Sequence, residues 1–148
     1  MSSKILLRIA ALLLLLHGIG YTFGVATWKD TNGDIAKQIP EVVRLMQSEN
    51  VNFKGIDSTM ARFYDGFGYC GTIFLFFLAI LLWILACRKD KSVIKILWVT
   101  CGAIVALAML EMIYFFPMAW MFCLISTALI VVSIFQIQKN DKRSNATI

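Results

Sequence analysis

The feature that most constrains this chain is its division into four apolar blocks, each about as long as a membrane is thick. A helix needs about 20 mainly apolar residues to cross roughly 30 Å of hydrocarbon. Blocks of that length lie at residues 5–26, 66–87, 93–114 and 117–137. Because lipid offers no hydrogen bonds, each backbone polar group must be satisfied inside its own helix. The sequence therefore predicts an all-α fold, a bundle of four transmembrane helices.

The composition agrees with a membrane protein. Of 148 residues, 59% are hydrophobic and 16% are charged, whereas soluble domains are nearer a quarter charged. The length allows one domain, which we expect at residues 1–138, followed by a polar cytoplasmic tail at residues 139–148. The net charge is +5, but the basic residues stand at the ends of the apolar blocks. We therefore expect membrane lipid and no nucleic acid as a partner.

The positions of those basic residues predict the orientation. Cytoplasmic flanks of membrane helices carry an excess of lysine and arginine. Lys4 and Arg8 stand at the amino end, and further basic residues follow the second block and the fourth block. The turn between the third and fourth blocks has no charge. Both ends are thus predicted to be cytoplasmic (N-in/C-in), with the loop at residues 27–65 outside.

A second interpretation of the first block stays open. Gly24-Val25-Ala26 resembles the small-residue cleavage site of a secretory signal peptide. The apolar stretch is longer than the usual core of such peptides, about 7–15 residues, and it contains His17. Retention of the first helix is the favoured interpretation, and cleavage at this site is the alternative.

The outer loop carries its own helical pattern. Ile39, Val42, Val43 and Met46 recur at helical spacing, with Pro40 at a suitable helix start. This pattern predicts a short amphipathic helix that lies on the outer surface or caps the bundle. Ser58 or Thr59 offers an N-cap, so the second long helix is expected to begin before the bilayer.

Polar side chains gather toward the outer mouth of the predicted bundle. A rise of 1.5 Å per residue places His17 roughly 20 Å beyond Lys4 and Glu111 roughly 27 Å beyond Val93. Both therefore fall in the outer half of the membrane. An ionisable group at that depth is costly and marks a candidate functional site. The predicted polar pocket draws on three helices: His17, Tyr21, Arg62, Asp65, Tyr69 and Glu111.

Structural roles are the alternative for these residues. Glu111 lies close enough to the interface to pair with Arg62. His17 can bond a backbone carbonyl or Tyr21, and Arg62 with Asp65 can form a surface ion pair. Each of these contacts would satisfy the group without any ligand.

Glycines predict where helices approach closely. Gly20 and Gly24 form a GxxxG spacing in the first block, a spacing that lets another helix backbone come near. Gly68 and Gly71 stand where the second block enters the membrane. We expect these two pairs of glycines to pack against each other.

No motif for metal, cofactor or nucleotide binding is visible. The four cysteines contain no CxxC pair, and buried cysteines usually act as small hydrophobic residues. A disulfide between Cys70 and Cys123 is an alternative that the sequence leaves open. No cofactor or metal is therefore expected.

The whole chain resembles small, largely uncharacterised bacterial four-helix membrane proteins. The likeness is carried by the HGxGxTxG-like segment at residues 17–24, the soluble outer loop, and the aromatic and glycine-rich residues 62–68. The general plan is similar to that of DoxX-like proteins, and more loosely to sterol-isomerase-like bundles, which use intramembrane histidine and glutamate. The isomerase residues have no one-to-one match here, so the resemblance implies a fold and a location, the bacterial inner membrane, and no catalytic role.

Two functional hypotheses follow. The first is a non-enzymatic accessory or interaction subunit that joins a membrane-protein partner or forms a homo-oligomer, because no catalytic set is recognisable. The second is an outer-leaflet pocket lined by His17 and Glu111 that binds a lipid or quinone-like molecule or performs acid–base catalysis. Transport ranks below both, since four short helices without internal symmetry leave little room for alternating access.

Overall fold

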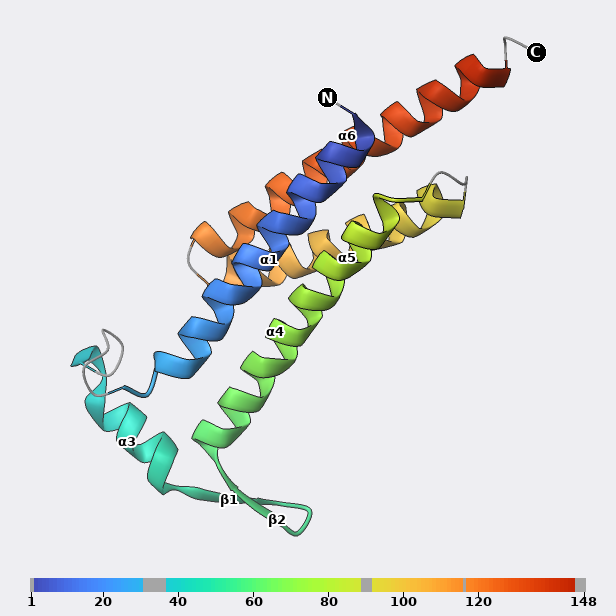
Figure 1. Cartoon of the computed structure of the whole chain (residues 1–148). Coiled ribbons are helices and arrows are strands. Elements are labelled where there is room, and N and C mark those ends of the chain that lie inside the picture. The colour runs from blue at the N-terminus through green and yellow to red at the C-terminus, as the bar shows by residue number, and fades with distance from the viewer. Residues whose placement is uncertain (1, 31–36, 89–91, 116, 146–148) are drawn as a thin grey trace. The chain divides into compact units, whose positions relative to one another are not determined.

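The computed structural model describes residues 2–30, 37–88, 92–115 and 117–145, and only the backbone of residues 53 and 142–145. Within these residues the chain is helical apart from one hairpin (Figure 1). The elements are α1 (Ser3–Thr27), α3 (Pro40–Ser48), β1 (Asn50–Phe53), β2 (Ile56–Thr59), α4 (Met60–Leu85), α5 (Ser92–Tyr114) and α6 (Pro117–Asn145).

Four of these helices, α1, α4, α5 and α6, are long and apolar enough to cross a membrane. Each carries a window of high hydropathy with few charged residues, which is the composition that hydrocarbon tolerates. The predicted all-α fold with four membrane-spanning helices is confirmed. The chain is thus a membrane protein, and its helices are consistent with a four-helix transmembrane bundle.

Two helices extend beyond their expected bounds by more than one turn. α4 begins at Met60 instead of residue 66, because the Thr59 hydroxyl oxygen accepts a hydrogen bond from the Arg62 backbone N–H at 3.3 Å and caps the first turn. α6 continues to Asn145 rather than ending at residue 137. The added residues contain no glycine or proline that would interrupt the helix.

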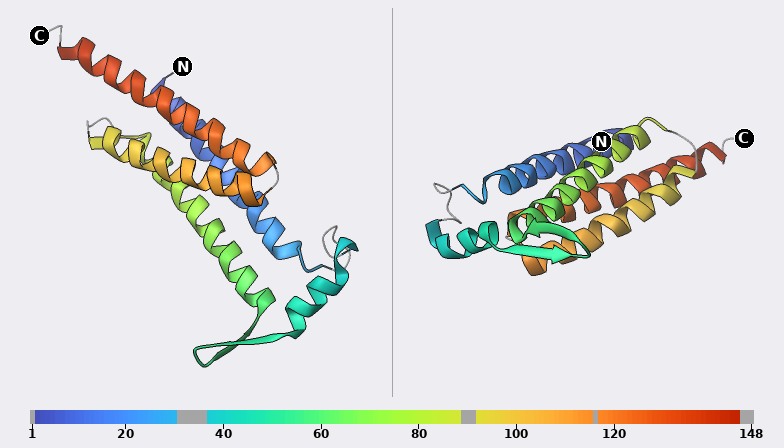
Figure 2. Two further views of the ribbon diagram at one scale, coloured as in Figure 1. Left: turned by 180° about the vertical axis from the view of Figure 1, so that it is seen from behind. Right: turned by 90° about the horizontal axis from the view of Figure 1, so that it is seen from below.

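The contacts divide the chain into two compact units, residues 1–17 with 75–148 and residues 18–74. In the first unit, α5 and α6 lie side by side in all views (Figure 2). Each helix of this unit buries one stripe at a spacing of three or four residues, as a helix with one packed face does. On α5 that stripe includes Leu97, Ile104, Ala108 and Glu111.

Polar side chains of α6 fix its register against α1 in the first unit. The Ser133 hydroxyl donates to the Ser3 carbonyl oxygen at 3.2 Å, and the Ser126 hydroxyl donates to the Ala10 carbonyl oxygen at 3.4 Å. Both serines are fully buried. Residue numbers fall along α6 as they rise along α1, so the two helices run antiparallel. Small polar residues of this kind let helices approach and bond to each other in lipid.

The second unit holds the predicted amphipathic helix, which is present as α3. Its Val43 is buried with Trp28 and Ala61 in a small apolar core, and Met46 packs against that core. Val42, next along the helix, is 48% exposed. On the polar side Arg44 donates two hydrogen bonds to Glu41, which lowers the pKa of that carboxyl. The helix therefore caps a core of its own.

The hairpin of β1 and β2 is a feature that the sequence analysis did not predict. The strands pair antiparallel from Asn50 opposite Thr59 to Phe53 opposite Ile56. Lys54 and Gly55 form the turn with φ of 51° and 84°, the left-handed values that a tight two-residue hairpin turn requires. Asn52 supports the turn, since its side-chain oxygen accepts from the Gly55 N–H at 3.1 Å.

Candidate polar site of the first unit

His17 and Glu111, the two ionisable residues predicted at membrane depth, meet in the first unit. Nε2 of His17 lies 3.2 Å from Oε1 of Glu111. Only 5% of His17 and 2% of Glu111 is exposed. The distance is that of an ion pair, although the two atoms lack the alignment of a hydrogen bond. Glu111 therefore pairs with His17 and not with Arg62, the structural alternative suggested by sequence.

Cys123 of α6 completes this cluster. Its thiol donates to Oε2 of Glu111 at 3.3 Å, and its sulfur lies 3.6 Å from Nδ1 of His17. Cys123 is fully buried. Each of the three side chains thus contacts the other two, and each comes from a different helix.

Local structure explains why the three residues meet. The α5–α6 connection is short, so Glu111 near the end of α5 lies beside Cys123 near the start of α6. The antiparallel register of α1 and α6 then brings His17 to the same level. The ring of Phe122 stacks on the His17 imidazole, with centroids 5.8 Å apart and planes 22° apart. This stacking restrains the imidazole plane.

The cluster presents the atoms that bind metal ions. One ligating atom from each residue, an imidazole nitrogen, a thiol sulfur and a carboxylate oxygen, can be chosen so that all lie within 4.8 Å of one another. The sequence did not predict a metal site, because metal motifs are recognised by short spacings along the chain. Here the ligating groups come from α1, α5 and α6, so no such spacing exists.

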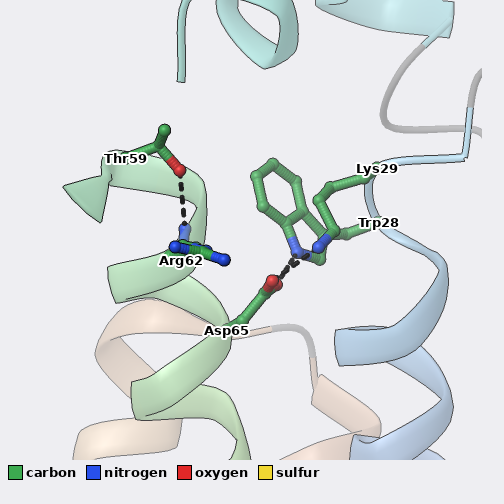
Figure 3. A network of polar contacts seen from close by, with 5 residues as sticks. All are labelled: Trp28, Lys29, Thr59, Arg62 and Asp65. Carbon is green, nitrogen blue, oxygen red and sulfur yellow. Dashed lines mark hydrogen bonds and ion pairs between the residues drawn. The ribbon is translucent and has the colours of Figure 1, made fainter. Parts of the chain in front are cut away.

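Asp65 belongs to a different network, in the second unit. Its carboxylate accepts a hydrogen bond from Nε1 of Trp28 at 2.9 Å and another from Nζ of Lys29 (Figure 3). Trp28 in turn contacts the Tyr64 ring, with centroids 4.7 Å apart. Asp65 thus joins the start of α4 to the end of α1. The pair with Lys29 replaces the surface pair with Arg62 considered from sequence.

The remaining predicted pocket residues lie in the second unit as well. Arg62 lines an open depression of about 430 Å³ on α4 and β2. Tyr69 is 46% exposed, and Tyr21 packs close to Gly71. The residues that line this depression are Ile56, Ser58, Arg62, Phe63, Gly66, Phe67 and Cys70. His17 and Glu111 do not line it.

The predicted glycine contacts are half present. A Cβ on Gly68 would collide with the Val25 side chain, and one on Gly71 would come within 3.1 Å of the Tyr21 ring. Gly68 and Gly71 therefore do face α1. Gly20 and Gly24 do not face them, since a Cβ at either position meets no described atom within 4 Å. Val25 and Tyr21, on another face of α1, fill that interface instead.

Cys123 is the site residue that sequence analysis missed. Buried cysteines usually act as small hydrophobic residues, but helical rise places Cys123 well inside the last apolar block. Pro117 begins α6, so Cys123 stands about 9 Å beyond that start at 1.5 Å per residue. All four cysteines are unbridged, so the alternative of a Cys70–Cys123 disulfide is not realised.

Comparison of the chain with protein families, with curated proteins and with solved structures finds no match.

Proposed function

We propose that this chain is a multi-pass membrane protein that binds a small cation at the cluster of His17, Glu111 and Cys123. One observation carries the proposal: three side chains with ligating atoms, from three helices, lie in mutual contact within a buried part of the first unit. Such groups are rare at membrane depth and mark functional positions by default.

The closeness of the three groups favours an ion over a larger ligand. Their contacts of 3.2–3.6 Å leave no room for a group of several atoms between them. A lipid or quinone head group would have to separate the helices that carry them. Acid–base catalysis at His17 and Glu111 would similarly require a substrate to enter this contact. Binding of a cation requires neither the separation of these helices nor the entry of a substrate between the side chains.

Electrostatics favour the same interpretation. A buried carboxylate costs several kcal/mol unless a positive charge compensates it. A cation bound between Glu111, Cys123 and His17 supplies that compensation directly. The His17–Glu111 pair can also supply it alone if the imidazole is charged, which makes a purely structural ion pair the competing explanation.

A thermal-stability titration separates the two explanations. The full chain, in mild detergent and without a histidine tag, is heated with each of Mg²⁺, Ca²⁺, Mn²⁺, Co²⁺ and Zn²⁺. A bound cation stabilises by about 2.7 kcal/mol at 100 times its Kd, so a saturable rise in Tm is expected for at least one cation. E111Q should abolish the rise, and E41Q, at an exposed glutamate, should retain it. A Tm that no cation raises would leave only the structural ion pair.

A second candidate function, an interaction subunit, is favoured by a separate observation. A Cβ added at Gly20 or Gly24 of α1 would meet no described atom within 4 Å outside its own stretch of helix. Glycines so spaced allow a helix of another protein, or of a second copy, to approach the backbone. Native mass spectrometry of the mildly extracted protein tests this candidate. G20L/G24L should shift a dimer or complex to the monomer, and a monomeric wild type would exclude a homo-oligomer.

The proposed location is a bacterial inner membrane with both ends cytoplasmic. The antiparallel register of α1 and α6 supports ends on one side, and the basic flanks favour the cytoplasmic side. Cysteine labelling from outside tests this orientation. Cys70 should react in intact cells and Cys87 should not, since both are exposed but Cys70 lies in the first half of α4 and Cys87 lies just beyond its last residue.

A further inference from the structure

We infer that the cation bound by this cluster is a divalent transition metal of the zinc class, held by Cys123, His17 and Glu111. The inference rests on the proposed cation-binding function and names the chemistry of its ligand. It depends on the identity of the three ligating atoms and on their spacing.

The spacing fits tetrahedral coordination. Zinc binds sulfur at about 2.3 Å and imidazole nitrogen or carboxylate oxygen at about 2.0–2.2 Å, which at tetrahedral angles separates the ligating atoms by about 3.4–3.6 Å. The Cys123 sulfur lies 3.6 Å from Nδ1 of His17 and 3.3 Å from Oε2 of Glu111. Two edges of the tetrahedron are therefore already near their final length. The third edge, between His17 and Glu111, requires side-chain rotation, and one ligating atom from each residue can be chosen so that all three lie within 4.8 Å of one another.

The donor set selects the class of metal. Magnesium and calcium prefer oxygen ligands and take six or more of them. Thiolate and imidazole instead suit zinc and its neighbours in the first transition row. The cluster offers sulfur, nitrogen and oxygen once each, a mixed set that suits a borderline ion. Three protein ligands also match zinc sites that keep a fourth position for water or another ligand.

Charge balance favours a divalent ion in particular. A metal-bound cysteine is a thiolate, and with the Glu111 carboxylate it contributes two negative charges, while a ligating imidazole is neutral. A divalent cation makes the whole cluster neutral, which a low-dielectric interior favours. Binding releases the thiol proton of Cys123 and any proton held by His17 or Glu111 to the solvent, so the charges balance on both sides.

The surroundings of the ligands support a prepared site. Metal-binding side chains are usually oriented by additional contacts. Phe122 stacks on the His17 imidazole, and Oε1 of Glu111 is buried without a hydrogen bond while its other oxygen faces Cys123. Oε1 instead makes the ion-pair contact with Nε2 of His17, and a metal between the two residues would take the place of that contact.

Cobalt spectroscopy of the full chain tests the inference. The protein is produced without a histidine tag in a C70S/C87S background, which removes the two exposed cysteines as competing ligands. Titration with Co²⁺ should give one equivalent per chain, with a sulfur-to-cobalt charge-transfer band and the strong visible bands of tetrahedral cobalt. Zn²⁺ should displace these bands.

Two buried cysteines provide the matched comparison. C101S removes a buried thiol outside the cluster and should leave the spectrum unchanged, whereas C123S should abolish the charge-transfer band. E111Q and H17A should weaken Co²⁺ binding at least about tenfold. A band that survives C123S, or that disappears in C101S, would overturn the assignment.

A measurement on the unsubstituted ligands guards against variants that fail to fold. His17 is the one histidine of the chain, so X-ray absorption of the zinc-loaded C70S/C87S protein should show one imidazole and one sulfur around the metal. Coordination by oxygen alone would overturn the inference.

The two proposals fail in different ways. If Mg²⁺ or Ca²⁺ raises the Tm in a Glu111-dependent manner while Co²⁺ gives no charge-transfer band, cation binding stands and the zinc class is wrong. If no cation of either kind binds saturably, both proposals are wrong.

Discussion

Oε1 of Glu111 on α5 lies 3.2 Å from Nε2 of His17 on α1, and the other carboxylate oxygen and the other ring nitrogen both face the sulfur of Cys123 on α6. One small polar cluster thereby connects three helices. Because each group contacts the other two, removal of one changes the environment of both that remain. The stability of the first unit should depend on all three residues jointly.

Substitution of Glu111 by alanine should destabilise the protein strongly. Removing one member of a buried ionic pair leaves the other uncompensated, which costs about 3–5 kcal/mol in soluble proteins. E111Q keeps a polar group of similar shape and should cost less. Unfolding in mixed detergent micelles measures both.

A double-substitution cycle with H17A should then show a coupling energy of about 0.5–3 kcal/mol between His17 and Glu111. Purely additive losses in H17A and E111Q would contradict direct interaction of the pair. E41A, at an exposed carboxylate outside the spans, should leave the unfolding midpoint unchanged and serves as the control.

The two buried serines of α6 should contribute separately from the cluster. S126A and S133A each remove one hydrogen bond to a backbone carbonyl oxygen of α1. Such interhelical bonds average about 0.6 kcal/mol in membrane proteins, so each substitution should cost roughly that amount. T127A removes a bond to the Cys123 carbonyl oxygen within α6 itself. If T127A lowers the free energy of unfolding as much as the serine substitutions do, the hydrogen bonds between α1 and α6 stabilise the protein no more than a bond within one helix.

The membrane-spanning architecture could be predicted from the sequence because it follows from the preference of long apolar blocks for hydrocarbon over water. Apolar blocks of membrane length are stable only where hydrocarbon surrounds them, so length and hydropathy alone locate α1, α4, α5 and α6. The meeting of His17 and Glu111 was partly predictable too, since helical rise predicts the same half of the membrane for both. Their direct pairing requires the helix order around the bundle, which hydropathy does not contain.

The two wrong predictions, on the glycine contacts and on Cys123, have a common physical cause. Gly20 and Gly24 were expected to pack on α4, but the α4 glycines accommodate Val25 and Tyr21 instead. Spacing identifies a face that permits close approach without identifying its neighbour. Cys123 was undervalued for the same reason, because its neighbours decide whether a buried thiol is a hydrophobic residue or a ligand. The hairpin turn at Lys54-Gly55, in contrast, could have been predicted from the local sequence, since a glycine that follows an alternating strand pattern is a turn signal.

Substitution of Asp65 should loosen the connection between the end of α1 and the start of α4. The carboxylate accepts from both Trp28 and Lys29, and hydrogen bonds to charged groups contribute about 1.5–3 kcal/mol when buried and less when solvent reaches them. With Asp65 partly exposed, D65A should cost about 1–2 kcal/mol. The loosened connection should be detected as faster cleavage of the segment between α1 and α4 by a protease.

R62A provides the comparison for that experiment. Arg62 is exposed, and its backbone N–H, which this substitution retains, makes the contact with Thr59. R62A should therefore leave the cleavage rate near that of the wild type. Equal rates for D65A and R62A would show that the Asp65 network does not restrain the segment.

Gly68 and Gly66 of α4 should respond oppositely to alanine, although they stand in the same helix. A Cβ at Gly68 would overlap the γ-carbons of Val25, which is buried and stiff about χ1 in a helix. G68A should therefore force the helices apart and cost about 1–3 kcal/mol. A Cβ at Gly66 meets no described atom within 4 Å, so G66A should be neutral or gain up to about 1 kcal/mol from helix propensity.

Detergent unfolding curves of G68A and G66A, measured side by side, provide this test. Alanine changes helix propensity equally at both positions, so the difference between the two variants reports the contact with Val25 alone. A V25A/G68A protein should recover part of the loss, because the smaller side chain makes room for the new methyl group. If G68A proves as stable as G66A, the close approach of α1 and α4 at this level is wrong, and with it the register that positions Trp28 against Asp65.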